Sequence, residues 1–549
     1  MAKHDFTRCD VSIGALACGL VAAVPIGALA QALEQTASVE TRSGRVRGMR
    51  VDGVSCFLGI PYGADTHSRR FQPALPVPAW TGVRDCFTYG ATAPQGSLGI
   101  GGSRTGASAN AEVMRVMATL FSAGPQDRPP PESEDCLVLN VFTPDPSPSR
   151  KRPVMFWLHG GGFAQGSGSS AAYDGSALCR RGDVVVVTIN HRLNAMGYLY
   201  LGAFHDDFAD SGNVGQLDQI LALQWVRDNI EAFGGDPHNV TIFGESGGGA
   251  KVSVLLAMPA AGGLFHKAII QSGPGIRMVE RVDAAELAER TLAALSVPKA
   301  DIHKLQSLDS KAIISAATAA QGTPGMGPRS LSPVVDGRSL PRHPFDPDAP
   351  KGALNIPVIV GTNKDEATLF TMFDPDFGKM TVEQVQQRFA TMLGERSSAA
   401  LELFRKRRPN DPPTYWFTSM VTSMGTWINS IRLAERKAMQ GGAPAFMYRL
   451  DWETPVLNGT LKAPHGLDTP LVFDNADKAA GLCGTGTEPP KIAADMSQAW
   501  INFARTGNPS REGLAWPPYE AGSRKTMVFD VPSHATSDPD SEARQFFAT

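Results

Sequence analysis

The stretch GESGGGA at residues 244–250 places one serine, Ser246, among four glycines. The five residues before it, NVTIF at 239–243, predict a buried strand, and AKVSVLLAMPA at 250–260 predicts an apolar helix. Gly-x-Ser-x-Gly between a strand and a helix is typical of a sharp, strained turn whose flanking residues must lack bulk. Such a turn exposes the hydroxyl at a helix N-terminus, where free N–H groups and the helix dipole favour developing negative charge. We therefore predict that Ser246 is a nucleophile; the alternative is a glycine-rich turn with an incidental serine.

A serine hydroxyl is a weak nucleophile, so the chain must also supply a base, an acid that orients the base, and donors for an oxyanion. The motif WLHGGGF at residues 157–163 follows an apolar run, and its glycines leave backbone N–H groups uncovered. We predict an oxyanion hole formed by the N–H groups of Gly161, Gly162 and Gly247; the alternative for this motif is a plain flexible turn. His159 in the same motif is expected to be structural.

The base for Ser246 is predicted to be His465, which follows a late strand in a loop where its ring can project. Its late place in the chain fits the order serine, acid, histidine. The acid must then lie between the two at a strand end, where VIVGTNKDEATLF contains Asp365 and Glu366. Spacing leaves the choice between these carboxylates open. It also leaves three other histidines open as the base, namely His303, His343 and His534.

Apolar runs of strand length recur along the chain, with helical stretches between them. The clearest are residues 153–160, 183–190, 239–244, 267–273, 356–363 and 443–450. One intervening stretch, 217–233, has apolar residues at helical spacing. Near-continuous apolar strands that alternate with helices predict an α/β fold, with a large, mostly parallel central sheet and helices on both faces. We expect residues 31–549 to form a single domain of this kind.

Three segments differ in composition from this alternation. The glycine- and serine-rich residues 96–110 and the proline-rich residues 124–135 predict a long mobile excursion. Residues from about 372 to 440 have a helical pattern with aromatics that we expect to be exposed, including Trp416 and Trp427. This region predicts a cap-like insertion over the sheet edge. We expect the loops at 96–135 and the insertion at 372–440 to shape any binding pocket.

Residues 1–30 are predicted to be a signal peptide and not part of the fold. Two basic residues precede the apolar run 11–30, which ends in the small-residue signal Ala-Leu-Ala. We predict cleavage near Ala30, a secreted or periplasmic mature chain and no membrane anchor. An uncleaved anchor and lipid attachment at Cys18 are the alternatives. No later apolar run is long enough to span a bilayer.

Composition argues against several partners and cofactors. The formal net charge of −3 gives no basic surplus for a nucleic acid or an anionic membrane. Of seven cysteines, two lie in the predicted signal peptide, and the other five are odd in number and widely spaced, which does not suit a disulfide scaffold. Because no CxxC pair and no histidine cluster has zinc-ligand spacing, we predict no metal and no cofactor.

Many motifs of the chain resemble, in the same order, those of the type B carboxylesterases, the cholinesterase-like branch of the α/β-hydrolases. They are GIPYG…RRFQP (59–73), SEDCLVLNVFTP (133–144), HGGGF (159–163), residues 218–249, QSG (271–273), GTNKDEA (361–367), APHG (463–466) and WINFARTGNPS (500–510). The resemblance covers nearly the whole mature chain. It implies Ser246 as nucleophile, His465 as base and Glu366, not Asp365, as acid. It also implies an oxyanion hole formed by Gly161, Gly162 and Gly247. Glu245 and Ser272 are implied to lie behind the histidine.

The chain departs from the family pattern at several positions. Gly247 replaces the usual alanine of GESAGG, which is expected to leave the turn looser. Ala93 stands where the family often has the disulfide partner of Cys136, so a loop disulfide would need Cys86 instead. Asp468 stands where many members have glutamate. The glycine- and serine-rich loop lacks a match to the aromatic choline site, so a quaternary-ammonium substrate is not expected.

The residues and the resemblance together predict a serine carboxylic-ester hydrolase that acts on small-molecule esters through an acyl-enzyme. The fumonisin esterases, a subgroup that releases tricarballylate side chains from a mycotoxin, are an alternative within the same chemistry. A non-catalytic binding protein, an amide or carbamate hydrolase and an interfacial lipase remain as candidates of different function.

Overall fold

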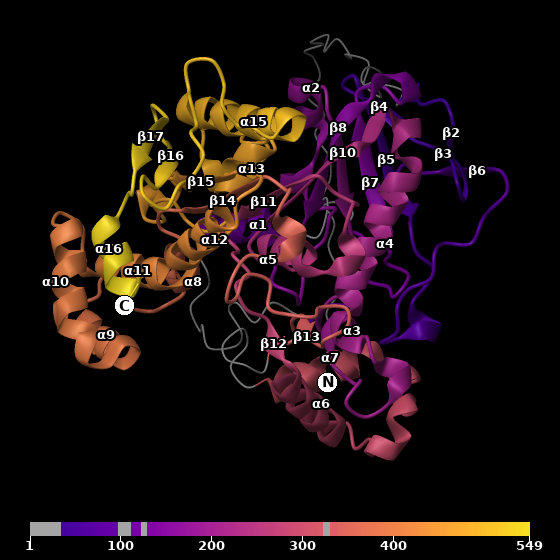
Figure 1. The fold of residues 1–549 in the computed structure, drawn as a ribbon, viewed down its shortest axis with the longest axis horizontal. Helices are drawn as coiled ribbons and strands as arrows, with labels where there is room; N and C mark the ends of the chain where they lie inside the picture. The colour runs from indigo at the N-terminus through magenta and orange to yellow at the C-terminus, as the bar shows by residue number, and fades with distance from the viewer. Residues whose placement is uncertain (1–33, 97–110, 122–128, 322–329, 549) are drawn as a thin grey trace, which may run out of the picture.

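The computed structural model describes residues 34–96, 111–121, 129–321 and 330–548 of the 549-residue chain (Figure 1). The predicted signal peptide lies outside the described residues. So do nearly all of the glycine- and serine-rich loop and the first part of the proline-rich segment.

A twelve-stranded sheet forms the centre of the molecule. In spatial order its strands are β1 (Glu34–Gln35), β4 (Met49–Val51), β5 (Val54–Pro61), β7 (Val138–Thr143), β9 (Val185–Ile189), β8 (Arg152–Leu158), β10 (Gly235–Glu245), β11 (Lys267–Gln271), β14 (Val358–Asn363), β15 (Ala445–Leu450), β16 (Lys525–Phe529) and β17 (His534–Ser537). The strands from β9 to β16 in this order are parallel, and antiparallel strands flank them on both sides. Every strand-length run predicted from the sequence is a strand of this parallel centre, so the predicted α/β fold is confirmed.

Two smaller sheets and a set of helices complete the described structure. The small sheets contain β2 (Val39–Thr41), β3 (Gly44–Arg47) and β6 (Val83–Asp85), and β12 (Val279–Glu280) and β13 (Val334–Val335). The α-helices are α1 (Ala111–Phe121), α2 (Ser176–Gly182), α3 (Asn194–Tyr198), α4 (Val214–Asn229), α5 (Gly247–Ala257), α6 (Arg281–Ala294), α7 (Ser310–Ala320), α8 (Ala367–Thr371), α9 (Val382–Leu393), α10 (Ser397–Arg407), α11 (Pro413–Thr422), α12 (Ile428–Met439), α13 (Asp468–Val472), α14 (Ala480–Cys483), α15 (Glu488–Thr506) and α16 (Ser541–Ala548). No helix within the described ranges is long and apolar enough to cross a membrane.

Both faces of the central sheet are buried, which explains why its strands are apolar at nearly every position. In β8, Val154, Phe156 and Leu158 pack into the core on one face, while Met155 and Trp157 pack into the core on the other. Side chains of α4, α5 and α12 belong to the first core. Side chains of α2, α13 and α15 belong to the second. Helices therefore cover both faces, as predicted.

The helices of the segment 372–440 pack in two different places. Helices α9 to α11 pack with the C-terminal α16 around a hydrophobic cluster of their own, beside the sheet (Figure 1). Helix α12 packs on the sheet core instead. Trp416 and Trp427 are only 7% and 3% exposed, so the expectation of exposed aromatics is wrong. The reason is that Trp416 lies inside the α9–α11 cluster, with its Nε1 donating to the carbonyl of Arg408 at 2.9 Å.

The described cysteines form no disulfide, and Cys86 and Cys136 are both free and buried. Burial raises the pKa of the Cys86 thiol to about 12 and raises the pKa of Cys136 as well. The substitute pairing of these two cysteines is therefore absent, and both thiols are held protonated in the core.

Candidate active site

Ser246 lies on the turn between the end of β10 and the start of α5. Its backbone has φ 57° and ψ −123°, and its N–H donates to the carbonyl of Gln271 at 2.8 Å. A Cβ at Gly244 would overlap the backbone of Gly248, and one at Gly248 would overlap the carbonyl of Leu158. Close packing therefore requires glycine on both sides of the serine, and the surrounding structure maintains its strained conformation. This is the turn that the sequence predicts.

The glycine motif after β8 faces this turn. Gly161 and Gly162 have φ values of +83° and +63° and line the same cavity as the serine. Among the described residues, the N–H groups of Gly161, Gly162 and Gly247 have no acceptor, so they are free to bind a ligand oxygen. His159 is buried, and its Nδ1 lies 2.9 Å from the carbonyl oxygen of Gly160, which fits the structural role expected for it.

Gly247 does not leave the turn looser, as its replacement of alanine suggested. A Cβ built on Gly247 would overlap the carbonyl oxygen, Cα and carbonyl carbon of Gly162. The backbone of the glycine motif thus occupies the space that a methyl group would fill. The turn is therefore closely packed at Gly247, contrary to that expectation.

His465 and Glu366 come together after β15 and β14, respectively. The Nδ1 of His465 lies 2.5 Å from one carboxylate oxygen of Glu366. The other oxygen accepts hydrogen bonds from the Ser272 hydroxyl at 2.6 Å and from the Asn363 N–H at 2.7 Å. Glu366 and His465 are both buried. The carboxylate is therefore fully bonded and holds the imidazole with its Nδ1 proton towards Glu366.

The other ring nitrogen of His465 faces Glu245, the residue before the serine. Nε2 lies 3.2 Å from Oε1 of Glu245, and no hydrogen bond within the described structure joins His465 to Ser246. Burial by itself would lower the pKa of His465, but Glu245 and Glu366 raise it to about 9. Burial raises the pKa of Glu245, while the nearby His465 opposes that rise. Hydrogen bonds of catalytic groups are often long in ligand-free structures, so Nε2 is placed to turn from Glu245 to the serine.

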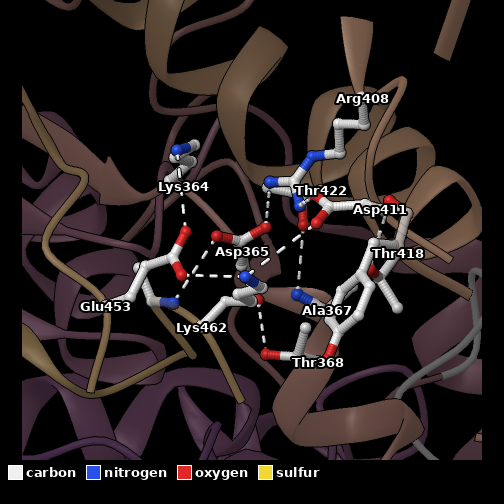
Figure 2. A network of polar contacts seen from close by, with 12 residues as sticks. Lys364, Asp365, Ala367, Thr368, Arg408, Asp411, Thr418, Thr422, Glu453 and Lys462 are labelled. Carbon is white, nitrogen blue, oxygen red and sulfur yellow. Dashed lines mark hydrogen bonds and ion pairs between the residues drawn. The ribbon is translucent and has the colours of Figure 1, made fainter. Parts of the chain in front are cut away.

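Asp365 and Glu366 are neighbours in sequence but have different partners. Figure 2 shows Asp365 in a polar network with Arg408, Asp411, Lys462 and Glu453. The buried Asp365 pairs with Arg408, which also pairs with Asp411 at 3.0 Å. Lys462 and Glu453 form a further pair at 2.9 Å. The structure therefore brings Glu366 to the histidine and uses Asp365 in a separate ion-pair network.

The three other histidines considered as bases lie elsewhere. His303 is exposed beside His205, and His343 contacts Glu280 at 2.9 Å. His534 is exposed in β17. None of these three lines the cavity that contains Ser246.

The cavity at Ser246 has a volume of about 700 Å³ and a mostly apolar wall. Its apolar side chains include Leu120, Phe163, Ile314, Leu331, Leu369, Phe370 and Leu482. Among the described residues, its only charged or readily titratable lining side chains are Glu245 and His465. No residue of 372–440 lines it within the described ranges, so the predicted insertion does not shape this cavity there. Gly96, Thr119 and Leu120 line it, as expected for the region 96–135. Residues of α7 and 330–332 also line it, and their sequence carried no signal that identified them.

The fold is that of the α/β-hydrolases. The model of the carboxylesterase family matches residues 35–547. The para-nitrobenzyl esterase of Bacillus subtilis (strain 168) is 36% identical over 515 residues, covering 92% of this chain and 97% of that protein. The fumonisin B1 esterase of Sphingopyxis macrogoltabida is 33% identical over 530 residues, covering 93% and 91%.

Solved structures give the same result. A carboxylesterase from Geobacillus stearothermophilus superposes with a TM-score of 0.78 at 37% identity, over 93% of this chain and 100% of that one. The chain belongs to the carboxylesterase family, and it is a carboxylic-ester hydrolase.

Proposed function

We propose that Ser246, His465 and Glu366 form the catalytic triad of this esterase. The observation that carries the proposal is the buried 2.5 Å contact of Glu366 with His465, which lines the cavity that contains Ser246. His465 takes the serine proton through Nε2, and Ser246 attacks the ester carbonyl carbon. The alcohol leaves with that proton, and water then hydrolyses the acyl-enzyme by the same route.

The N–H groups of Gly161, Gly162 and Gly247 stabilise the oxyanion in this mechanism. All three are free of protein acceptors in the described structure, and they belong to two loops in direct backbone contact. One such donor typically contributes about 3–4 kcal/mol to transition-state stabilisation. Glu366 fixes the histidine tautomer and stabilises the imidazolium that forms.

We infer that the substrates are small neutral esters with an apolar acyl or alcohol group. The described cavity wall has seven large apolar side chains and no lysine or arginine. A tricarballylate ester carries carboxylates, which are best bound by cationic partners. The similarity to a fumonisin B1 esterase therefore makes such esters a comparison substrate, for which we expect lower kcat/KM than for neutral esters.

The triad is tested by hydrolysis of p-nitrophenyl esters of short and long chain length. Ser246→Ala should reduce kcat by ~10³-fold or more, because it removes the nucleophile. Equal activity of the wild type and this variant would contradict the proposal. Tricarballylate esters in the same panel test the substrate preference, and higher kcat/KM on them than on neutral esters would overturn it.

The role of Glu366 has a matched control in its neighbour Asp365. Glu366→Gln should reduce kcat by roughly 10²-fold or more, because it loses the charge that stabilises the imidazolium. Asp365→Asn weakens the pair with Arg408 and should lower the melting temperature while kcat of the folded enzyme stays within a few-fold. The reverse pattern would assign the acid to Asp365.

We also propose that residues 1–30 direct export and are removed near Ala30. The small-residue signal and the apolar run support this, and the family match begins shortly afterwards, at residue 35. The mass of the protein recovered outside the cytoplasm tests it. A chain that retains Met1 in that fraction would contradict cleavage.

A further inference from the structure

His205, Asp207 and His303 meet on the surface although almost one hundred residues separate the two histidines. One ligand atom from each lies within 4.8 Å of the other two. Asp207 belongs to a 3₁₀-helix, Asp206–Phe208, that His205 precedes, and His303 lies in another, Lys299–Gln306. The Nε2 atoms of the two histidines are 3.5 Å apart. Oδ2 of Asp207 lies 3.7 Å from Nδ1 of His205 and 3.7 Å from Nε2 of His303.

A buried aromatic ring positions both imidazoles. The ring centroid of Phe208 lies 6.1 Å from that of His205 and 5.1 Å from that of His303. Phe208 is fully buried, whereas both histidines remain about half exposed. Each imidazole therefore packs against a buried ring on one side and is exposed to solvent on the other. An ion can reach the imidazole nitrogens from the exposed side.

The neighbouring cations already have partners. Lys299 pairs with Glu289 at 2.7 Å, and Lys304 pairs with Asp301 at 2.8 Å. Asp207 thus keeps a negative charge directed between two imidazoles, with no lysine or arginine contacting it in the described structure.

We propose that His205, Asp207 and His303 bind a first-row transition-metal dication such as Zn²⁺, with water completing the coordination. Two imidazoles and one carboxylate are typical ligands for such ions. Tetrahedral ligands about 2.0–2.1 Å from zinc are about 3.3–3.4 Å apart. With one nitrogen of His205 as ligand, the three ligand atoms lie within 4.8 Å of one another, so binding draws the most distant pair together by up to about 1.5 Å.

Binding changes one existing hydrogen bond. Nδ1 of His205 accepts from the N–H of Asp207 at 3.2 Å, so it carries no proton in this arrangement. Coordination through Nδ1 replaces that bond, and coordination through Nε2 requires the proton on Nδ1. Either mode gives up one exposed hydrogen bond and gains a metal–nitrogen bond.

The ion would join two segments that support the wall of the active-site cavity. Phe208 and Ile302 lie in one hydrophobic cluster with Ile314 and Leu331, and the last two line the cavity. A bound ion that links the two 3₁₀-helices should therefore stabilise this part of the molecule. The ion has no role in the esterase chemistry.

Zn²⁺ titration calorimetry and Co²⁺ absorption at pH 8, on the mature chain treated first with a chelator, test the proposal. The wild type should bind one ion per chain at this site, and Zn²⁺ should raise its melting temperature. His303→Ala should weaken binding by at least ~10-fold and abolish the thermal shift. His238→Ala, which removes an exposed histidine outside the cluster, should bind as the wild type does.

Equal Zn²⁺ binding by the wild type and His303→Ala would overturn the proposal, as would no binding by the wild type at micromolar protein. Asp207→Asn provides a second variant if His303→Ala fails to fold, and the same criterion applies to it.

Discussion

Three buried carboxylates surround His465, and their balance sets its protonation. Glu366 contacts Nδ1 and Glu245 contacts Nε2. Asp468, the residue that departs from the family's glutamate, accepts from Gln271 at 2.9 Å and from the Tyr448 hydroxyl at 2.6 Å. Each carboxylate adds negative charge near the imidazole and raises its pKa. The histidine must lose its proton before it can act as a base, so this cluster places the onset of activity towards alkaline pH.

Replacement of Glu245 by glutamine should move the acid limb of the kcat/KM profile to lower pH. The carboxylate of Glu245 favours the protonated imidazole, so its removal lowers the pKa of His465 from about 9. The wild type should gain activity as pH rises through that value, and the variant should gain it earlier. The measurement is the pH dependence of kcat/KM for the wild type and for the variant. If the acid limb of the variant stays at the wild-type pH or moves to higher pH, Glu245 does not set the pKa of His465.

Single residues were predictable to different degrees. The roles of Ser246 and the glycine motifs could be predicted from local spacing. Close packing across a turn requires glycine at fixed positions, and these glycines are visible in the sequence. The choice between Asp365 and Glu366 does not, because adjacent side chains after a strand point to different surroundings. Contacts with distant residues separate them in space, because Asp365 pairs with Arg408 whereas Glu366 contacts His465.

At the scale of elements, strand order assembles the site. Strands β10, β11, β14 and β15 are neighbours and parallel, so their carboxyl ends meet at one edge of the sheet. Ser246, Ser272 and Glu366 follow the first three of these strands, and the loop of His465 follows the fourth. Apolar runs predicted the strands because both faces are buried. The part of the cavity wall that α7 forms could not be predicted, because the pattern of α7 shows which side is apolar but not which element it covers.

The two helical segments should respond differently to an added bulky side chain. Thr318 is an exposed residue of α7 that lines the cavity, whereas Met392 is an exposed residue of α9 that does not. Thr318→Trp should reduce kcat/KM for long-chain p-nitrophenyl esters several-fold relative to short-chain ones, because it narrows the cavity. Met392→Trp should leave that ratio unchanged within twofold. A change in ratio for Met392→Trp alone would assign the role of a cap to the segment 372–440 and not to α7.

At the scale of the whole molecule, segments from most of the chain meet at one cavity. Its described wall extends from Gly96 to Leu482, and the family match extends further, over residues 35–547. Sequence motifs identified the chemistry because each motif is local. The part of the cavity wall that α7 forms and the His205–Asp207–His303 cluster depend on long-range contacts, so only the fold shows them. Ligands that are close in space but distant in sequence leave no spacing pattern to recognise.

Covalent labelling with a fluorophosphonate, followed by peptide mass spectrometry, tests the central claim most directly. A serine activated by His465 and Glu366 should take up one label per chain, on the peptide that contains Ser246, and esterase activity should fall in proportion to labelling. The Ser246→Ala variant should remain unlabelled. Full esterase activity in labelled protein, or a stoichiometric label on another residue, would contradict the assignment of Ser246 as the nucleophile.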